Sequence, residues 1–187
     1  MTSQEQTQQS TLEKILLKKQ QAGVSTFGGG SNQVVDVNEK VVKLVIFSLG
    51  DQWYAFYGES ISEILPKGTM IFFVPGCPPS LTGVINVRGE IESVINISMF
   101  LKLTESEQAE SQNIVLLAKS PVMSSGVSVD KVIDVVDVPE RIIQSPTNTL
   151  PDDIRPYVLD VLEFRSQAVT VLDVNTIFKD YQQGLGS

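Results

Sequence analysis

The side chains that could do chemistry in this chain are its carboxylates, one thiol and an arginine set between two β-branched runs. No histidine is present, so a Ser-His-Asp or Cys-His arrangement for nucleophilic catalysis cannot form, nor can a phosphohistidine relay within the chain. Cys77 stands alone in the turn-like stretch PGCPP, whereas a zinc site needs several cysteine or histidine ligands. The sequence therefore indicates a protein that is not an enzyme and that holds no metal or cofactor.

Three carboxylates cluster in the stretch DKVIDVVD, namely Asp130, Asp134 and Asp137. Their spacing is near one helical turn or one face of a strand, which is typical of a solvated acidic surface. A hydrolase that uses a pair of these carboxylates stays the weakest of the alternatives. No EF-hand spacing or Walker lysine occurs, and FGGGSN is not followed by a helix that could cradle phosphate.

Arg88 lies in GVINVRGEIESVIN, residues 83–96, where Arg-Gly interrupts an otherwise apolar and β-branched run. Two such runs around a two-residue break predict a β-hairpin with Arg88 at its crest. A guanidinium in that position can form a forked contact with a carboxylate or a carbonyl of a partner protein. Such a role needs no catalytic neighbour.

The charge balance limits the classes of partner. The chain of 187 residues has 14 basic and 22 acidic side chains, which gives a formal net charge of −8. This argues against nucleic acid and against a polybasic membrane anchor, because both need clustered Lys and Arg. The start MTSQEQTQQS lacks a signal-peptide pattern, and no apolar run approaches the ~20 residues of a membrane-spanning helix. With a single cysteine, these features predict a cytoplasmic protein without direct membrane insertion.

Residues 1–39 differ in composition from the rest of the chain. They are rich in Gln, Ser and Gly, which predicts a flexible, disordered N-terminal arm. Within the arm, TLEKILLKKQ predicts a short helix that is marginal alone and whose apolar face could dock on a partner. Residues 40–181 are expected to form the folded domain, as two intertwined β-barrel subdomains, and residues 182–187 a tail.

From residue 40 the pattern is that of a mainly β chain. Strands do not alternate with helices of 10 to 15 residues, so a doubly wound parallel fold is not expected. Paired apolar runs predict three hairpins, at 40–49 with 52–57, 81–87 with 90–97, and 157–164 with 167–174. Further strands are expected at 70–74, 113–119 and 126–136, a helical turn or bent strand at 59–65, and short helices at 98–103 and 175–181.

The two halves of the β-rich region resemble each other in sequence. VINISMFLK, from residue 94, matches VLDVNTIFK, from residue 171, at an offset of 77 positions, and Arg88 and Arg165 keep this offset. Upstream, FYGESISEIL matches VSVDKVIDVV at an offset of 71 positions, which aligns Glu63 with Asp134. Chance similarity among Val- and Ile-rich strands is the competing explanation. Two constant offsets favour two related small β-barrels with a loop insertion in one copy.

Residues 40–181 resemble the CheW-like domain of bacterial chemotaxis coupling proteins. The resemblance is carried by LVIFSLGDQWYAF, ISEIL, VPGCPPSLTGVINVRGEIESVINI, GVSVDKVIDVV and VTVLDVNTIF, in the order found in that family. It implies two five-stranded β-barrels of the Src-homology-3 type, with short helices, and an adaptor role without catalysis. The implied partners are the regulatory domain of a CheA-type histidine kinase and the cytoplasmic tip of methyl-accepting chemoreceptors, in membrane-associated receptor arrays. The receptor's helical hairpin would lie in an apolar groove between the barrels.

The resemblance also implies which residues contact the protein partners. They lie in two segments, one at a strand end and one in the hairpin around Arg88: Ile61 and Glu63, then Gly83, Val84, Asn86, Val87, Arg88 and Gly89. Each has a structural alternative. The two glycines could satisfy turn geometry, and the two valines could belong to the core.

The chain also departs from the family pattern. Asn96 replaces the usual acidic residue after the valine-rich strand, and Ser98, Met99 and Phe100 replace basic residues. A surface of this kind leaves open an adaptor of a type IV pilus or phototaxis-type chemosensory pathway with altered partners. A CheW-like module that senses a small ligand between the barrels is a further alternative, for which the sequence offers few convergent polar groups.

Overall fold

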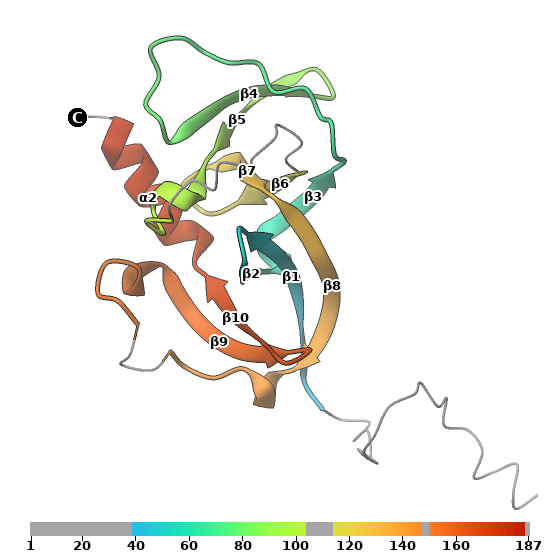
Figure 1. The fold of residues 1–187 in the computed structure, drawn as a ribbon. Coiled ribbons are helices and arrows are strands. Elements are labelled where there is room, and N and C mark those ends of the chain that lie inside the picture. Colours follow the sequence, from blue (N-terminus) through green and yellow to red (C-terminus); the bar gives the residue numbers. More distant parts are fainter. Residues whose placement is uncertain (1–38, 104–113, 147–149, 186–187) are drawn as a thin grey trace, which may run out of the picture. The chain divides into compact units, whose positions relative to one another are not determined.

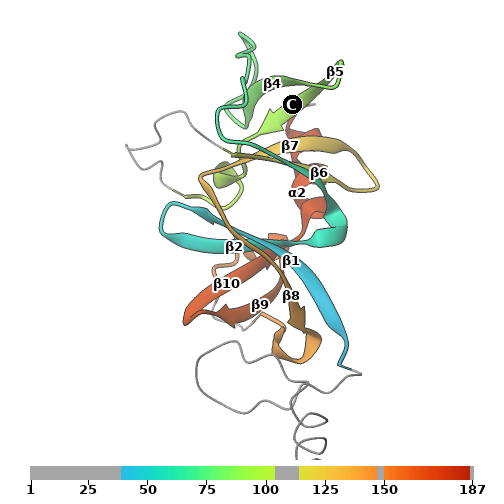
Figure 2. The same cartoon turned by 90° about the vertical axis from the view of Figure 1, so that its right-hand side faces the viewer.

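The computed structural model describes residues 39–103, 114–146 and 150–185, all within one compact unit that begins at Asn38. The expected helix in TLEKILLKKQ and the acidic loop TESEQAESQ lie outside the described residues, as does the expected N-terminal arm apart from its last residue. The strands of the described residues form two five-stranded mixed sheets. Figures 1 and 2 show how these strands are arranged in space. The expected mainly β fold with two five-stranded units is confirmed.

The two sheets have the same arrangement of strands. Sheet A contains, in spatial order, β8 (Lys131–Pro139), β1 (Val41–Leu49), β2 (Gln52–Tyr57), β10 (Gln167–Leu172) and β9 (Val158–Phe164). Sheet B contains β3 (Ile61–Leu65), β6 (Ile114–Lys119), β7 (Ser124–Val129), β5 (Glu90–Ile95) and β4 (Leu81–Val87). Neighbouring strands are antiparallel except for β2 with β10 and β5 with β7, which are parallel.

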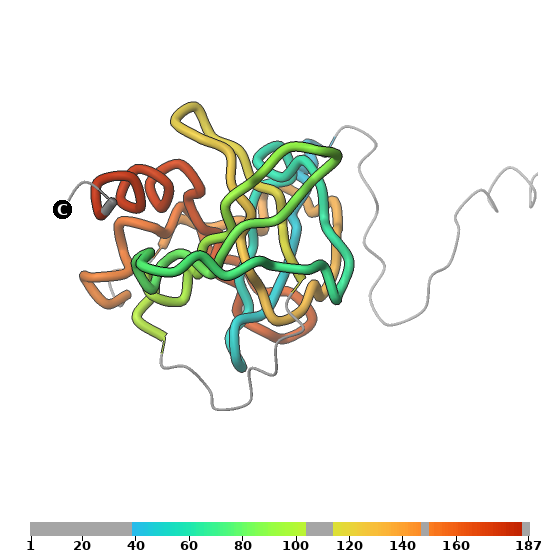
Figure 3. The backbone as a smooth tube through the Cα atoms, turned by 90° about the horizontal axis from the view of Figure 1, so that it is seen from above, coloured from blue at the N-terminus to red at the C-terminus, as the bar shows by residue number. Residues whose placement is uncertain are grey.

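The two sequence halves exchange strands between the sheets. Sheet A combines the first two strands of the first half with the last three strands of the second half. Sheet B combines the first two strands of the second half with the last three strands of the first half. The tube in Figure 3 follows this path from β1 (blue) to the C-terminal helix (red). Each sheet is therefore assembled from both copies of the repeat.

The strand irregularities confirm that the halves are structural repeats. Each bulge leaves one residue without a partner in the register: Ser62 in β3, Thr82 in β4, Ile133 in β8 and Leu159 in β9. Ile133 follows Ser62 by 71 positions and Leu159 follows Thr82 by 77, the two offsets found in the sequence. A bulge bends a strand at a defined residue, so its recurrence at both offsets is not explained by similar composition alone.

The core consists of one cluster between the sheets and one cluster within each sheet. Strand β1 contributes to two of them, because Leu44 and Ile46 pack inside sheet A while Val45 and Phe47 face the central cluster. Burial on both faces explains why β1 reads as a continuous apolar run instead of an alternating one. Ile85 and Val94 fill the cluster within sheet B.

The short helices are fixed by side-chain caps at equivalent positions of the two halves. Helix α2 (Val174–Leu185) follows Asp173, whose carboxylate accepts hydrogen bonds from the Asn175 N–H (2.9 Å) and the Thr176 hydroxyl (2.6 Å). The 3-10 turn η2 (Ile97–Met99) follows Asn96, whose Oδ1 accepts a hydrogen bond from the Ser98 N–H at 3.0 Å. The remaining 3-10 turns of the described residues are η1 (Gly58–Ser60), η3 (Glu140–Ile142) and η4 (Arg155–Tyr157).

Several element boundaries differ from the sequence predictions. The predicted strand at 70–74 is wrong: only Phe72 forms a β-bridge, to Val84, and the prolines from Pro75 onward lack the N–H that ladder pairing needs. The predicted strand at 126–136 is two strands, β7 and β8, separated at Asp130 where the chain passes from sheet B to sheet A. The predicted helix at 98–103 is the shorter turn η2, and the one at 175–181 continues to Leu185. The segment 59–65 contains both η1 and the bent strand β3.

Candidate functional site

The crest of the β4–β5 hairpin is a two-residue turn. Arg88 has φ +54° and Gly89 has φ +93°, so both central residues occupy the left-handed region, as a type I′ turn requires. The Asn86 Oδ1 accepts a hydrogen bond from the Gly89 N–H at 2.9 Å. Asn86 and Gly89 thus have a clear structural function in forming the turn that presents Arg88.

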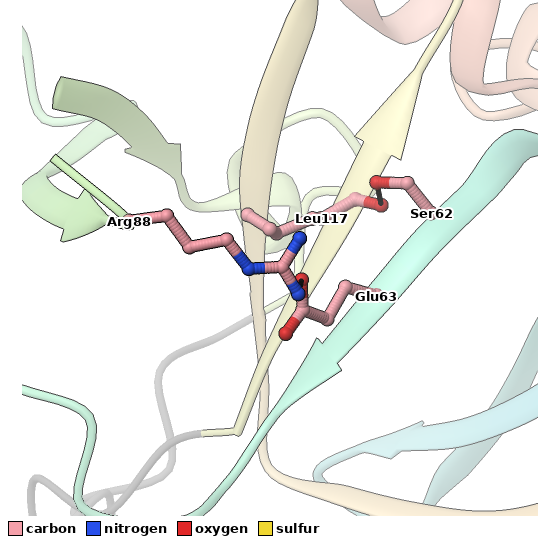
Figure 4. Close-up of polar contacts among 4 residues, drawn as sticks. All are labelled: Ser62, Glu63, Arg88 and Leu117. Carbon is pink, nitrogen blue, oxygen red and sulfur yellow. Dashed lines mark hydrogen bonds and ion pairs between the residues drawn. The ribbon is translucent and has the colours of Figure 1, made fainter. Parts of the chain in front are cut away.

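Arg88 forms an ion pair with Glu63 on strand β3. Its Nη2 donates to the Glu63 Oε2 at 2.9 Å, and Figure 4 shows the guanidinium extending from the hairpin to β3. Since β3 and β4 are the two edges of sheet B, this contact, here called the sheet B ion pair, connects opposite edges of one sheet. The Arg88 side chain is still 80% exposed, so the guanidinium remains accessible to a partner.

The bulge in β3 places Glu63 for this contact. Ser62 is the bulged residue, and its hydroxyl donates to the Leu117 carbonyl of β6 at 3.0 Å (Figure 4). Ile61, directly before it, is half-buried and packs against the central cluster. A bulge of this kind re-aims the following side chain, which here is the acceptor for Arg88.

Sheet A contains an equivalent ion pair. Arg165, with φ +51°, donates from Nη2 to the Asp134 Oδ2 at 2.6 Å, and this contact is here called the sheet A ion pair. The Arg165 guanidinium also stacks on the Phe164 ring at 4.8 Å from the centroid. The sequence alignments of the halves paired the two arginines and the two acids separately, but the ion pairs themselves were not predicted.

The other predicted contact residues divide into core and surface. Gly83 is buried, with φ +155°, and a Cβ there would lie 2.4 Å from the Phe72 carbonyl oxygen, so the close approach of residues 71–72 requires glycine. Val87 is half-buried and packs against the sheet B cluster. Val84 is half-buried beside Phe72. The structure thus brings Glu63 and Arg88 together and gives Gly83 and Val87 packing roles.

The departures around Asn96 also have structural correlates. Asn96 caps η2 as Asp173 caps α2, so an amide does at this position what a carboxylate does in the second half. Phe100 packs edge-on against Tyr157 with 6.0 Å between ring centroids. Met99 is 47% exposed.

The three clustered aspartates are engaged separately. Asp130 accepts a hydrogen bond from the Gly50 N–H (2.6 Å), Asp134 pairs with Arg165, and Asp137 pairs with Lys43 at 3.0 Å. None of these carboxylates is paired with another carboxylate in these contacts. Their geometry is that of structural and surface charges, which gives no support to the hydrolase alternative.

A cavity of about 610 Å³ opens at the end of sheet A, among residues that include Lys40, Val41, Tyr57 and Glu140. The Tyr57 hydroxyl donates to the Asp160 Oδ2 at 2.6 Å, and Lys40 pairs with Glu140 at 2.9 Å. Burial, with this hydrogen bond, raises the pKa of Tyr57 above its ordinary value. These polar groups already satisfy one another, so the cavity gives no specific support to a ligand-sensing role.

Among the described residues, no helix is both long and apolar enough to cross a membrane.

The comparisons with known proteins agree on one family. The family model described as the CheW-like domain matches residues 43–182. The chemotaxis protein CheW of Bacillus subtilis is 27% identical over 135 residues, which are 72% of this chain and 85% of that protein. The probable chemotaxis protein CheW of Rhizobium etli is 26% identical over 152 residues, 80% of this chain and 96% of that protein.

A solved structure resembles the fold. It is the scaffolding protein TtCheW from Thermoanaerobacter tengcongensis, with a TM-score of 0.65 and 21% identity. The similarity covers 75% of this chain and 94% of that one. It supports the arrangement of the two five-stranded sheets.

Proposed function

The chain belongs to the CheW-like domain family, and from this premise we propose that it is a non-catalytic adaptor of a chemotaxis-type signalling pathway. It couples the cytoplasmic tips of methyl-accepting chemoreceptors to the regulatory domain of a CheA-type histidine kinase, in the cytoplasm at membrane-associated arrays. The match of the family model over residues 43–182 carries the proposal. The names of the relatives support it, since they are chemotaxis proteins and the structural neighbour is a scaffolding protein.

The geometry of the hairpin supports a docking role for its crest. Arg88 is held in a defined turn, is oriented by a single ion pair and is 80% exposed. An arginine at an interface can form forked hydrogen bonds to a partner's carboxylate while neighbouring charges set the rate and specificity of association. We include Ile61, Glu63, Val84 and Asn86 in the same docking surface because they lie on the two segments that meet at this ion pair.

The proposal is tested by co-purification with the kinase and receptor of the same organism. The full-length chain is immobilised and exposed separately to the kinase regulatory domain and to a receptor cytoplasmic fragment. Retention of both, and of a ternary complex when they are mixed, is the expected result. An adaptor role is wrong if the folded chain retains neither partner.

A further inference from the structure

The sheet B ion pair depends on how the Glu63 side chain is held. The Arg88 Nη2 donates to the Glu63 Oε2 at 2.9 Å, and neither side chain makes another hydrogen bond or ion pair within the described part of the chain. The Glu63 side chain is also 35% exposed. Since no neighbouring side chain except that of Arg88 fixes the carboxylate, its direction depends on the backbone from which it extends.

The sheet A ion pair provides an internal comparison, because its acid is held differently. The Asp134 Oδ2 accepts a hydrogen bond from Arg165 at 2.6 Å, and the Asp134 Oδ1 accepts one from the Val135 N–H at 2.9 Å. Both oxygens of this shorter side chain are thus held, one of them by the adjacent backbone. Glu63, its equivalent at the offset of 71 positions, has only the contact with an arginine. Sheet B must therefore direct its acid by other means.

The bulged residues that precede the two acids also differ. In sheet A the bulged residue is Ile133, whose apolar side chain packs against the sheet A cluster. In sheet B it is Ser62, whose hydroxyl donates to the Leu117 carbonyl at 3.0 Å (Figure 4). Because sheet A forms the equivalent bulge without a hydroxyl, the bulge itself does not require serine. The hydrogen bond of Ser62 is therefore an addition that only sheet B has at this position.

The acceptor of this hydrogen bond lies directly opposite Glu63. Leu117 of β6 is the register partner of Glu63, so the Ser62 hydroxyl joins the residue before the acid to the residue across from it. A bulge leaves its extra residue unpaired and disrupts the ladder locally. The hydroxyl restores a connection between β3 and β6 at the point where the Glu63 side chain leaves the strand, and so restrains the direction of that side chain.

The direction of Glu63 in turn determines that of the Arg88 guanidinium. The Arg88 Nη2 is engaged by Glu63, while its Nε and Nη1 form no hydrogen bond with any described residue and stay available to a partner. Charge-assisted hydrogen bonds of arginine carry geometric specificity as well as energy. A guanidinium that is already restrained loses less conformational entropy when it docks than a freely rotating one does.

We propose that Ser62 is a positioning residue of the docking surface. Its hydroxyl holds the bulge of β3 to β6, which directs the Glu63 carboxylate and thereby orients Arg88 for the partner protein. The inference deepens the proposed function, on which it rests for the docking role of Arg88. It adds to that surface a residue outside the predicted set, which acts through its neighbours and needs no contact of its own with the partner.

The orientation of Arg88 is tested first, without any partner. NMR of the full chain with ¹⁵N-labelled arginine measures how fast each guanidinium rotates about its Cζ–N bonds, a motion that a hydrogen bond to a carboxylate slows. The chain has four arginines, and Arg88→Lys identifies the signal of Arg88. Ser62→Ala is expected to speed its rotation about threefold, since loss of one hydrogen bond changes an equilibrium by a factor of about 2–10. Ser62→Thr keeps the hydroxyl and should leave the rate unchanged, as should Arg165 in every sample.

Binding of the kinase regulatory domain is then measured by calorimetry for the same variants. Ser62→Ala is expected to weaken binding about threefold, and Ser62→Thr should bind as the unsubstituted chain does. Ser124→Ala is the matched control, because Ser124 is an exposed serine of β7 in the same sheet whose hydroxyl makes no hydrogen bond among the described residues. It should change neither the rotation of Arg88 nor binding. Urea unfolding establishes that each variant is folded.

The inference is overturned if Arg88 rotates at the same rate in Ser62→Ala, or if its rotation quickens while the kinase domain binds equally well. It is also overturned if Ser62→Thr fails to rescue the effect, because the hydroxyl would then not be the cause. The NMR comparison requires neither kinase nor receptor. If the unsubstituted chain does not bind the kinase domain, the proposed function is contradicted, whereas the rotation rates still decide whether Ser62 orients Arg88.

Discussion

Exchanging the charges of the sheet B ion pair separates its structural role from a docking role. The double substitution Glu63→Arg with Arg88→Glu keeps opposite charges across the edges of sheet B but places a carboxylate at the hairpin crest. The contact is 2.9 Å long, with the Arg88 side chain 80% and the Glu63 side chain 35% exposed. Ion pairs this exposed contribute about 0.2–1 kcal/mol, so the exchanged chain should unfold within about 1 kcal/mol of the original.

The single substitution Arg88→Glu gives the reference for a broken ion pair. It removes the attraction and places a carboxylate near that of Glu63, a repulsion of about 1 kcal/mol at 4 Å in water. The expected loss is about 1–2 kcal/mol of unfolding free energy, and a chain of this size loses about 2–4 °C in Tm per kcal/mol. Urea unfolding followed by the fluorescence of the single tryptophan, Trp53, measures these differences.

Binding of the kinase regulatory domain is then measured for the same variants. We expect at least tenfold weaker binding for Arg88→Glu and for the exchanged pair, although only the latter regains stability. The matched control exchanges the sheet A ion pair, Asp134→Arg with Arg165→Glu, and should leave binding within about twofold. If the exchange of Glu63 and Arg88 restores binding together with stability, Arg88 acts only through the ion pair and the docking role assigned to it is refuted.

Three further outcomes follow from the structure. Gly83→Ala should lower the free energy of urea unfolding by more than about 2 kcal/mol, because the new Cβ would lie 2.4 Å from a backbone oxygen. Gly89→Ala has open space around it and should cost about 1 kcal/mol. Equal losses for the two variants would contradict this reasoning. Asp173→Ala removes the cap of α2 and should cost about 0.5–2 kcal/mol, while Asn96→Asp should be nearly neutral if capping is the role of that position. Burial, with a hydrogen bond to a carboxylate, raises the pKa of Tyr157 to about 12. As the pH rises, the unfolded chain loses this proton before the folded chain does, so the free energy of unfolding should fall between pH 10 and 12. The fall should be less steep in Tyr157→Phe.

The local features of the fold were accessible from the sequence because short-range chemistry determines them. Apolar runs around two-residue breaks located the hairpins that contain Arg88 and Arg165, and the constant offsets located the repeat. The prediction of a strand at 70–74 failed because Met70, Phe72 and Phe73 are on an exposed surface and only Phe72 forms a bridge. Hydrophobic periodicity does not distinguish these two environments when prolines interrupt the segment.

The site depended on contacts that no local pattern encodes. Arg88 and Glu63 are 25 positions apart and Arg165 and Asp134 are 31 apart, and each pair meets only because a bulge turns the acid toward the opposite edge of its sheet. The packing roles of Gly83 and Val87 likewise depend on which strand approaches them. Residue types predicted the hairpin around Arg88, but only the tertiary structure shows which of its side chains are buried and which are exposed.

The exchange of strands between the halves has a consequence for synthesis of the chain. Strands β1 and β2 are made first, yet β1 pairs with β8 and β2 pairs with β10, which are made in the second half. On the ribosome the first hairpin must therefore wait for most of the chain before its sheet can close, while sheet B can be completed earlier, once β7 has emerged. The N-terminal hairpin, although made early, can therefore be enclosed in its complete sheet only after translation of β10.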